Sequence, residues 1–347
     1  MRPEHHPQPR RIRLPAVAPF LAALLFGFPL TASAGVIRDN LYGVKAVGAS
    51  EEWAVGNFGS IYHTTDGGRT WEARESGTKT PLFRVDFADA QHGCAVGKSA
   101  LILATQDGGR TWRPQKSPIP SEKHLFYVRA IDTRTAWAVG DWGAIAVTHD
   151  GGTTWEDRSL GDDVVLYGVS FPDTEHGFIA GEFGTLLATA DGGQTWEKRD
   201  VGTDQTLFGV GFSTPRTGWA VGIDGLIVHT TDGGASWSIQ RGRARAEALE
   251  DLGFMETLKN PGLYDVQVVG QYGVVVGDTG VLLTTADGGE TWTQRELPED
   301  QRLAWMRAVS LAPGGRGLVV GAGGFSIGID QDRVGAPEKR RAAPPAS

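Results

Sequence analysis

Six times along its length, this chain repeats the pattern of Thr64-Thr65-Asp66-Gly67-Gly68-Arg69-Thr70-Trp71. The later copies of Asp-Gly-Gly-x-Thr/Ser-Trp begin at Asp107, Asp150, Asp191, Asp232 and Asp287. The tryptophans that end the copies are Trp71, Trp112, Trp155, Trp196, Trp237 and Trp292, at intervals of 41, 43, 41, 41 and 55 residues. A period of about 40 to 45 residues with several short strands per unit is typical of β-propeller blades.

Each repeat holds four segments that we interpret as strands, named A to D in chain order. Strand A is an apolar segment such as 207–212, and strand B is a second one such as 219–221. A turn with glycine at both ends, such as 222–225, suits a hairpin that needs positive φ, and strand C follows it. The Asp-Gly-Gly phrase makes the next turn, and strand D starts at its tryptophan. Such a four-stranded unit is typical of one propeller blade.

The repeated phrase resembles the Asp-box, or BNR repeat, whose pattern Ser/Thr-x-Asp-x-Gly-x-Thr-Trp is met by Thr64, Asp66, Gly68, Thr70 and Trp71. The resemblance implies an architectural role, in which the carboxylate caps backbone N–H groups of the turn and the indole packs against the neighbouring strand. We therefore expect the aspartate and tryptophan of every copy to be structural. A catalytic carboxylate would not need to occur six times.

The end of the chain holds a seventh, shorter repeat, with strand A at 306–309, B at 318–321 and C at 325–329. No Asp-box follows it, and we expect no strand D there. Segment 36–39 precedes the first strand A as a strand D would, so we expect it to pair with 325–329. The predicted fold is therefore all-β: a seven-bladed β-propeller with Asp-box repeats, in which the N-terminal strand closes the last blade.

The first 34 residues have the pattern of a secretory signal peptide. A basic start from Arg2 to Arg13 precedes an apolar stretch at 14–30, and Ala32-Ser33-Ala34 is a small-residue cleavage site. We predict cleavage after Ala34 and export to a periplasm, or to a thylakoid lumen in a photosynthetic organism. An uncleaved membrane anchor is the alternative, which the prolines in the short apolar run disfavour. The predicted domains are the signal peptide at 1–34, the propeller at 35–334 and a disordered tail at 335–347.

The charge of the exported part argues against nucleic acid as a partner. Without residues 1–34 the chain has 29 basic and 40 acidic side chains, a net charge of −11, whereas nucleic-acid binding needs a basic surface.

Cys94 is the only cysteine and takes a strand-B position that tryptophan holds in other repeats, so we expect a buried small side chain there. The histidines show no zinc-ligand spacing, and we expect neither a metal nor a cofactor.

Glycoside hydrolases of the sialidase type are the enzymes that an Asp-box chain resembles first. That resemblance would imply an arginine cluster, a tyrosine nucleophile with a glutamate partner, and an acid/base aspartate. The start motif Phe/Tyr-Arg-Ile-Pro of those enzymes is absent, and near-identical repeats argue against a single asymmetric active site. We therefore expect no enzymatic activity, with a sialidase-type hydrolase as the alternative.

As a whole, the repeats resemble the photosystem II stability and assembly factor family. The resemblance rests on Leu-Phe/Tyr-x-Val at the start of a blade, Trp-Ala-Val-Gly in its middle and Asp-Gly-Gly-x-Thr-Trp near its end, and it covers nearly all of 36–334. It implies an exported propeller that binds a newly made membrane protein and helps to assemble its complex without catalysis. The client stays open between a photosystem and another envelope complex, such as an exporter. We expect a soluble protein or one in peripheral contact with the membrane.

The B–C turns are the first candidate partner surface, because these turns and the D–A connections share one face of a propeller. They carry aromatic residues beside acids, and the contact residues that we assign are Phe58, Asp141, Trp142, Glu182 and Phe183. Exposed aromatic side chains are enriched in binding hot spots. The alternative is that these aromatic side chains fold onto neighbouring turns.

The connection after Trp237 is longer than its counterparts and is the second candidate element. Apolar side chains three and four residues apart predict a short amphipathic helix within it. The contact residues that we assign to this connection are Arg243, Arg245, Leu249, Leu252, Phe254 and Met255. An inert surface loop is the alternative.

Arginines recur at two further places in the repeats. One set lies three places after the box tryptophan, at Arg74, Arg158, Arg199 and Arg295. On an outer strand such charges protect an exposed sheet edge, and contact with anionic lipid or an acidic client is the alternative. The other set, Arg84, Arg129 and Arg307, occupies strand-A positions, where lining of the channel is one of the open interpretations.

Overall fold

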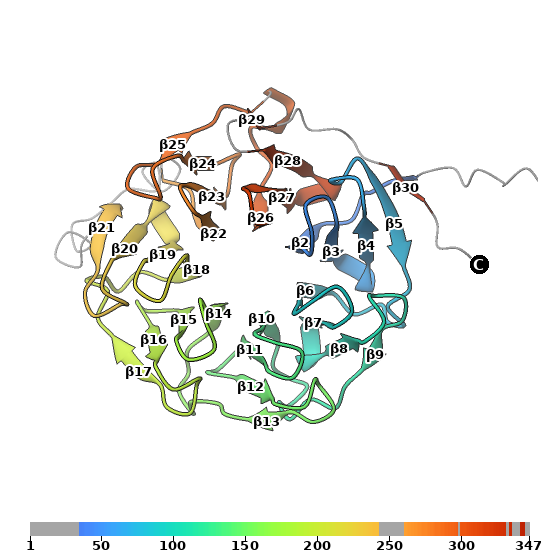
Figure 1. The fold of residues 1–347 in the computed structure, drawn as a ribbon, viewed down its shortest axis with the longest axis horizontal. Helices are drawn as coiled ribbons and strands as arrows, with labels where there is room; N and C mark the ends of the chain where they lie inside the picture. The colour runs from blue at the N-terminus through green and yellow to red at the C-terminus, as the bar shows by residue number, and fades with distance from the viewer. Residues whose placement is uncertain (1–34, 243–259, 298, 331–332, 335–340, 344–347) are drawn as a thin grey trace, which may run out of the picture. The chain divides into compact units, whose positions relative to one another are not determined.

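The computed structural model describes residues 35–242, 260–297, 299–330, 333–334 and 341–343. Seven sheets, each with four antiparallel blade strands, stand in a ring around a central channel, with strand A of each sheet innermost (Figure 1). The described residues form strands and short 3-10 turns, with no α-helix among them. The predicted all-β, seven-bladed propeller is therefore confirmed.

The two inner strands of each blade are the most buried. The A strands are β2 (Leu41–Ala46), β6 (Leu82–Phe87), β10 (Leu125–Ala130), β14 (Leu166–Ser170), β18 (Leu207–Phe212), β22 (Leu263–Val269) and β26 (Met306–Leu311). The B strands are β3 (Glu52–Gly56), β7 (Gly93–Gly97), β11 (Ala136–Gly140), β15 (Gly177–Gly181), β19 (Gly218–Gly222), β23 (Tyr272–Gly277) and β27 (Arg316–Gly321). Apolar side chains from adjacent blades interlock here, so that Trp53 and Val55 pack with Leu82 and Val85 in one buried cluster.

The two outer strands carry the Asp-box turn between them. The C strands are β4 (Ile61–Thr64), β8 (Ile102–Thr105), β12 (Ile145–Thr148), β16 (Leu186–Thr189), β20 (Ile227–Thr230), β24 (Leu282–Thr285) and β28 (Ser326–Asp330). The D strands are β5 (Thr70–Arg74), β9 (Arg113–Pro114), β13 (Glu156–Asp157), β17 (Glu197–Arg199), β21 (Ser238–Arg241), β25 (Thr293–Gln294) and β29 (Arg333–Val334). Four B–C turns form 3-10 segments, η1 (Asn57–Gly59), η2 (Lys98–Ala100), η3 (Ile223–Gly225) and η5 (Ala322–Gly324), and η4 (Glu299–Gln301) precedes β26.

The predicted closure of the ring by an N-terminal strand is wrong. The outer strand of the last blade is β29, which pairs with β28 through Ile329–Val334 and Asp330–Arg333. The N-terminal strand β1 (Gly35–Val36) instead pairs with β30 (Arg341–Ala343), and β30 adds to β5 at the edge of the first blade (Figure 1). Strand β30 falls within the segment 335–347 that we predicted to be disordered. The reason is local: 333–334 can fold back on β28 at once, so the last blade needs no distant partner.

Side-chain packing, not a shared sheet, joins the first and last blades. Ile37, Leu41 and Val44 form one buried cluster with Leu318 and Val320. Hydrogen bonds reinforce this contact, since Ala46 N–H donates to Ser310 Oγ at 2.8 Å and Gly323 N–H donates to Asn40 Oδ1 at 2.8 Å. Segment 37–40 thus seals the junction although it forms no strand of the last blade.

Candidate functional site

The B–C turns share one backbone conformation in all seven blades. The second residue of each turn has a φ between 48° and 59°, and these residues are Phe58, Ser99, Trp142, Phe183, Asp224, Thr279 and Gly323. The first residue of the turn donates its N–H to the carbonyl that lies before strand A, as Asn57 does to Asn40 at 3.1 Å. The B–C turns therefore lie beside the starts of the inner strands, on the side of the ring that we name the B–C face.

Three of these turns expose an aromatic side chain. The exposed fractions are 72% for Phe58, 50% for Trp142 and 66% for Phe183. The left-handed region costs a residue with a Cβ about 1 to 2 kcal/mol, whereas Gly323 adopts the same backbone in the last blade without that cost. The Phe58 and Phe183 side chains lie mostly at the surface, whereas the Trp142 ring is half covered and has Lys123 Nζ 5.8 Å from its centroid. Neither backbone preference nor burial accounts for aromatic residues at these places.

The two acids assigned to the same surface have structural partners. Asp141 Oδ2 accepts the N–H of His124 at 2.8 Å, and Glu182 Oε2 accepts the N–H of Val165 at 3.0 Å. Both donors lie just before a strand A, where the backbone has no partner in a sheet. The observed role of these carboxylates is therefore to tie a B–C turn to the neighbouring connection.

A ring of aromatic side chains surrounds the channel at the B–C face. Its members are the second residues of six A strands: Tyr42, Phe83, Phe126, Tyr167, Phe208 and Tyr264. Neighbouring rings have centroids 5.2 to 5.7 Å apart. In the last blade, Arg307 takes the place of the aromatic residue, and its guanidinium lies 4.9 Å from the Tyr264 ring centroid. Trp305 stacks on Tyr42, with ring centroids 5.7 Å apart. All these side chains are half-buried, so the ring presents apolar surface to solvent.

Our site assignment from sequence missed this ring, although its signal was present. The aromatic residue after the first leucine recurs in strand A of six repeats, and it served there only to identify the blades. The feature that makes it a site is a β-bulge: the register shifts between the first and third residue of every strand A, as between Leu41 and Gly43. The bulge bends the strand locally and frees the second side chain from the ladder. That geometry does not follow from hydrophobic alternation alone.

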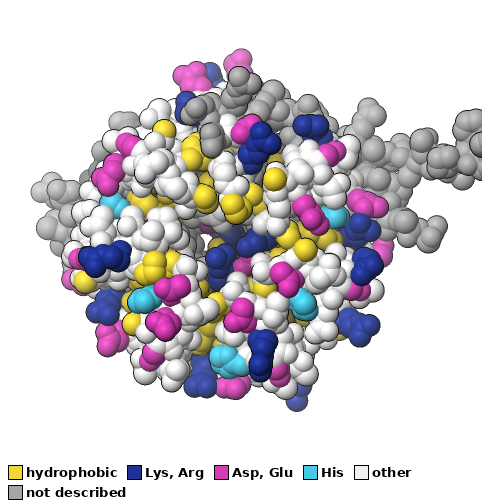
Figure 2. All heavy atoms as spheres, in the orientation of Figure 1, with side chains coloured by type: hydrophobic (Ala, Val, Ile, Leu, Met, Phe, Trp, Pro, Cys, Tyr) yellow, Lys and Arg dark blue, Asp and Glu magenta, His cyan; other side chains and the backbone are white. Residues whose placement is uncertain are grey.

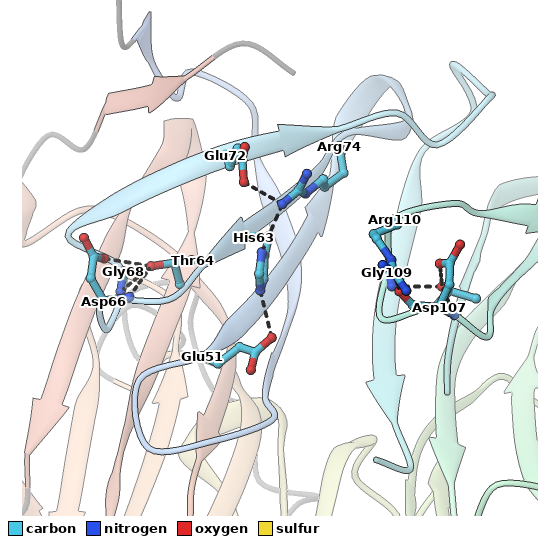
Figure 3. Close-up of polar contacts among 11 residues, drawn as sticks. Glu51, His63, Thr64, Asp66, Gly68, Glu72, Arg74, Asp107, Gly109 and Arg110 are labelled. Carbon is cyan, nitrogen blue, oxygen red and sulfur yellow. Dashed lines mark hydrogen bonds and ion pairs between the residues drawn. The ribbon is translucent and has the colours of Figure 1, made fainter. Parts of the chain in front are cut away.

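The Asp-box turns lie at the opposite side of the ring, beside the A–B loops. Gly67 N–H, in the first box, donates to the Ser50 carbonyl at 2.9 Å. Asp66 accepts the Thr70 N–H at 2.9 Å and the Thr70 hydroxyl at 2.7 Å. The Thr64 hydroxyl donates to Asp66 at 2.8 Å and accepts the Gly68 N–H at 2.9 Å (Figure 3). In the other five boxes, the backbone N–H of the residue four positions after the aspartate donates to the aspartate in the same way. Capping of the C–D turn is therefore the observed role of these carboxylates.

In the second, fourth and sixth blades, the second glycine of the box leaves room for a tryptophan of the preceding blade. A Cβ on Gly109 would lie 2.1 Å from the Trp53 ring, and its φ of 71° also favours glycine. The box tryptophan Trp112 packs edge-on against the same Trp53, with ring centroids 6.0 Å apart. The same clash would arise between Gly193 and Trp137. The box is thus a joint between blades as well as a turn.

Hydrogen bonds keep the box carboxylates ionised far below neutral pH. The Thr154 hydroxyl and N–H lower the pKa of Asp150 to about 2, and the Thr195 N–H and hydroxyl lower the pKa of Asp191 to about 2. Ser236 has the same effect on the pKa of Asp232, which is also about 2. Groups with such pKa values stay charged and cannot act as general acids near neutral pH.

Three of the four outer arginines pair with a glutamate two residues earlier in the chain, and the fourth, Arg295, donates from Nε to Thr284 Oγ1 at 2.7 Å. Arg74 lies 2.5 Å from Glu72 and 3.5 Å from His63, which in turn contacts Glu51 at 3.0 Å (Figure 3). The corresponding pairs Arg158–Glu156 and Arg199–Glu197 are 2.8 and 2.9 Å apart. These contacts favour the edge-protecting interpretation over contact with anionic lipid or an acidic client.

The arginines of strand A point to the channel. Arg84 NH1 lies 2.8 Å from Asp265 Oδ2, and Arg84 NH2 donates to the Tyr127 hydroxyl at 2.6 Å. Arg84 and Asp265 come from β6 and β22, whose sheets are not neighbours in the ring, so this ion pair crosses the channel. Both side chains are buried. The bridge separates the aromatic ring at the B–C face from the other end of the channel.

Several predicted features lie outside the described residues or concern absences. The signal peptide at 1–34 and the candidate element at 243–259, with all six of its assigned contact residues, fall outside the described parts. Within those parts, no group of three or more His, Cys, Asp or Glu side chains could hold a metal ion, and no helix is long and apolar enough to cross a membrane. Cys94 is buried, as expected.

Comparison with known proteins supports the interpretation of the repeats. Residues 75–164 and 158–246 match the family model of photosynthesis system II assembly factor YCF48, and residues 62–73 match the BNR/Asp-box repeat. No curated protein sequence matches the chain significantly. The resemblance to the photosystem II assembly factors is thereby confirmed.

Solved structures show the same fold at low sequence identity. YCF48 bound to a D1 peptide is 20% identical with a TM-score of 0.65, over 88% of this chain and 99% of that one. YCF48 from Cyanidioschyzon merolae is 19% identical with a TM-score of 0.67, over 87% of this chain and 100% of that one. A GH74 xyloglucanase from Xanthomonas campestris is 15% identical with a TM-score of 0.64, over 90% of this chain and 55% of that one.

Proposed function

Because the chain is a photosystem II assembly factor-like propeller built from Asp-box repeats, we propose that it is a non-catalytic factor that binds a membrane protein and assists the assembly or stability of its complex. The match to the assembly-factor family supports a role in protein binding. A related propeller that was solved with a D1 peptide supports a membrane protein as the partner. The client is a subunit of a photosystem or of another envelope complex.

The exposed aromatic side chains of the B–C face carry this proposal. Phe58, Trp142 and Phe183 stand in left-handed turns that glycine would occupy more cheaply, and they are half to three-quarters exposed. All seven blades adopt this left-handed turn, so the fold requires the conformation but does not require an aromatic side chain in it. Large aromatic side chains in an accessible place provide much of the energy of protein binding. The half-buried aromatic ring extends this apolar surface to the centre of the same face.

Site-specific crosslinking in the source organism tests the proposed face. A photoreactive amino acid is placed at 58, 142 or 183, and adducts are identified by mass spectrometry. The matched control positions are Arg69 and Arg110, which are exposed in Asp-box turns on the other side of the ring. We expect one membrane-protein subunit to be crosslinked from all three B–C positions and not from the controls. Equal crosslinking from the Asp-box turns would contradict the proposal.

The absence of catalysis and the export are parts of the same proposal. The support for the first is the assembly-factor match, and purified protein should release no fluorophore from sialoside or xyloglucan-type reporters. Turnover that is lost on mutation of one carboxylate would favour the hydrolase alternative instead.

The support for export is the sequence of residues 1–34. N-terminal sequencing of the protein isolated from the envelope should give Gly35 as the first residue.

A further inference from the structure

A polar cavity of about 200 Å³ occupies the end of the channel that lies away from the B–C face. Its walls are the later residues of the A strands, and its polar side chains are Lys45, Tyr127, Arg129, Ser170, Gln267 and Ser310. In a view along the axis of the ring, basic side chains gather around its hollow centre (Figure 2). We name this cavity the channel pocket. It lies on the other side of the Arg84–Asp265 bridge from the aromatic ring.

The neutral polar side chains of the channel pocket use their oxygen atoms for the fold. Ser170 Oγ accepts the Phe212 N–H at 3.1 Å, and Ser310 Oγ accepts the Ala46 N–H at 2.8 Å. Gln267 Oε1 accepts the Leu311 N–H at 2.8 Å. Each bond runs from one blade to the next. A hydroxyl or amide whose oxygen is engaged in this way still has hydrogens to donate, so these three groups offer the pocket donors.

The charged side chains of the channel pocket leave a surplus of positive charge. Lys45 Nζ lies 2.5 Å from Asp86 Oδ1, and Arg129 NH1 lies 3.6 Å from Asp86 Oδ2, so two cations share one carboxylate. That carboxylate also accepts the Ala130 N–H at 2.9 Å. The Arg129 Nε is buried and has no hydrogen-bond partner among the described residues. The pKa of Lys45 is lowered, mainly by burial. Asp86 raises this pKa, whereas the charges of Arg129 and Arg84 lower it further, as expected where positive charge is in excess.

We propose that the channel pocket binds a small oxyanion, a phosphate or carboxylate group, between Arg129, Lys45, Ser170, Ser310 and Gln267. An oxyanion supplies the acceptors that the donors of these side chains lack, and hydrogen bonds between charged partners are stronger than neutral ones. Its negative charge offsets the cation that Asp86 does not neutralise. The volume holds one such group with a few waters, since a water takes about 30 Å³.

Titration of the purified exported chain with inorganic phosphate tests the proposal. Heat of binding and melting temperature are followed while chloride keeps the ionic strength constant, because non-specific anion effects scale with ionic strength. A second titration uses a capped Gly-Glu-Gly peptide, with the capped Gly-Gln-Gly peptide as its control. Saturable phosphate binding supports a free anion as ligand. Saturable binding of the Glu peptide alone supports an acidic group that a partner protein presents.

Three variants connect the binding to the pocket. Arg129→Gln should weaken it about tenfold or more, the loss of one charge-assisted contact. Ser170→Asp should abolish it, because the new carboxylate can accept the Phe212 N–H as Asp86 accepts that of Ala130 while it repels the anion. Arg158→Gln makes the same change of charge on an outer strand and should leave the affinity unchanged. The proposal is overturned if neither probe saturates, or if Arg158→Gln weakens binding as much as Arg129→Gln.

Discussion

The Asp-box turns and the B–C turns both repeat around the ring, yet they differ in what is repeated. An Asp-box turn keeps its side chains: the aspartate, the glycines and the tryptophan recur in six blades with the same hydrogen bonds. A B–C turn keeps only its backbone, and its left-handed position holds phenylalanine, serine, tryptophan, aspartate, threonine or glycine. The fold therefore determines both the backbone and the side chains of the Asp-box turns, but only the backbone conformation of the B–C turns.

This difference separates architecture from function within one chain. Where a side chain fills a joint between blades, as Trp112 does against Trp53, its identity follows from packing. Where the fold accepts glycine or phenylalanine alike, as at Gly323 and Phe58, packing cannot explain the choice. The exposed aromatic residues of the B–C face are thus the ones to which we assign binding.

The largest effect should follow from loss of a box tryptophan. Trp71→Ala removes a side chain that is 2% exposed and should lower the free energy of unfolding by about 3 to 5 kcal/mol. Trp142→Ala removes an aromatic side chain of the same size from a B–C turn where it is 50% exposed, and should cost less than about 0.5 kcal/mol. Urea unfolding of both variants checks this. Similar losses would mean that the turn tryptophan is a packing residue.

A smaller loss should follow from removal of a box carboxylate. Asp66→Ala leaves the Thr70 N–H without its acceptor, as in the loss of a helix cap, and should cost about 1 to 2 kcal/mol. Glu197→Ala, on an exposed stretch of the outer strand, is the matched control and should change stability by less than about 0.5 kcal/mol. Thermal melting of the two variants distinguishes them, and equal shifts would remove the capping role from Asp66.

The box carboxylates should also make stability depend on pH in the acid range. The pKa values of Asp150, Asp191 and Asp232 are about 2 in the folded chain and about 3.8 for the ordinary carboxyl group. Because folding lowers these pKa values, their stabilising effect is complete above about pH 4 and is lost as the pH falls through about 2. The difference in melting temperature between wild type and the triple Asp→Asn variant at these positions should therefore shrink between pH 5 and pH 2. A constant difference would contradict the assigned pKa values.

The fold could be predicted from the sequence because the Asp-box depends only on residues that lie close together in the chain. A turn that needs Asp66, Gly68 and Trp71 within a few residues can be recognised without knowledge of the rest. Its six copies, with the shorter seventh repeat at the end of the chain, then give the number of blades. Closure of the ring was wrong because a short strand at 36 and one at 333–334 look alike in sequence, and the choice between them depends on which one the chain brings to β28. The roles of Asp141 and Glu182 also depended on partners that are 17 residues away in the chain.

The channel was the part of the molecule that sequence described least. Arg84 and Arg129 hold equivalent strands in adjacent blades, yet one crosses the channel to Asp265 and the other faces the channel pocket. The roles are separate because Arg84 is the third residue of β6 whereas Arg129 is the fifth residue of β10, which places the two side chains at different levels of the channel wall. The sequence alone left the direction of these arginines open, and lining of the channel was one of the interpretations that it allowed.

The smallest expected change in stability belongs to the B–C turns themselves. Phe58→Gly, Trp142→Gly and Phe183→Gly remove a left-handed Cβ, which stabilises by about 1 to 2 kcal/mol, and add freedom to the unfolded chain, which costs about 0.5 to 1 kcal/mol. Each variant should thus be as stable as wild type or more stable by up to about 1.5 kcal/mol. Ser99→Gly is the control, because it makes the same backbone change without loss of an aromatic ring. Chemical denaturation measures all four.

The most direct test is the binding of the triple variant Phe58→Gly, Trp142→Gly, Phe183→Gly to an array of synthetic peptides that covers the extramembrane segments of membrane proteins of the source organism. The wild type and Ser99→Gly should bind the same peptides with equal affinity. The triple variant should melt at or above the temperature of the wild type and should lose at least about tenfold in affinity for those peptides, since hot-spot aromatics contribute about 2 kcal/mol or more each. Unchanged binding by this folded variant would contradict the assignment of the B–C face as the partner surface.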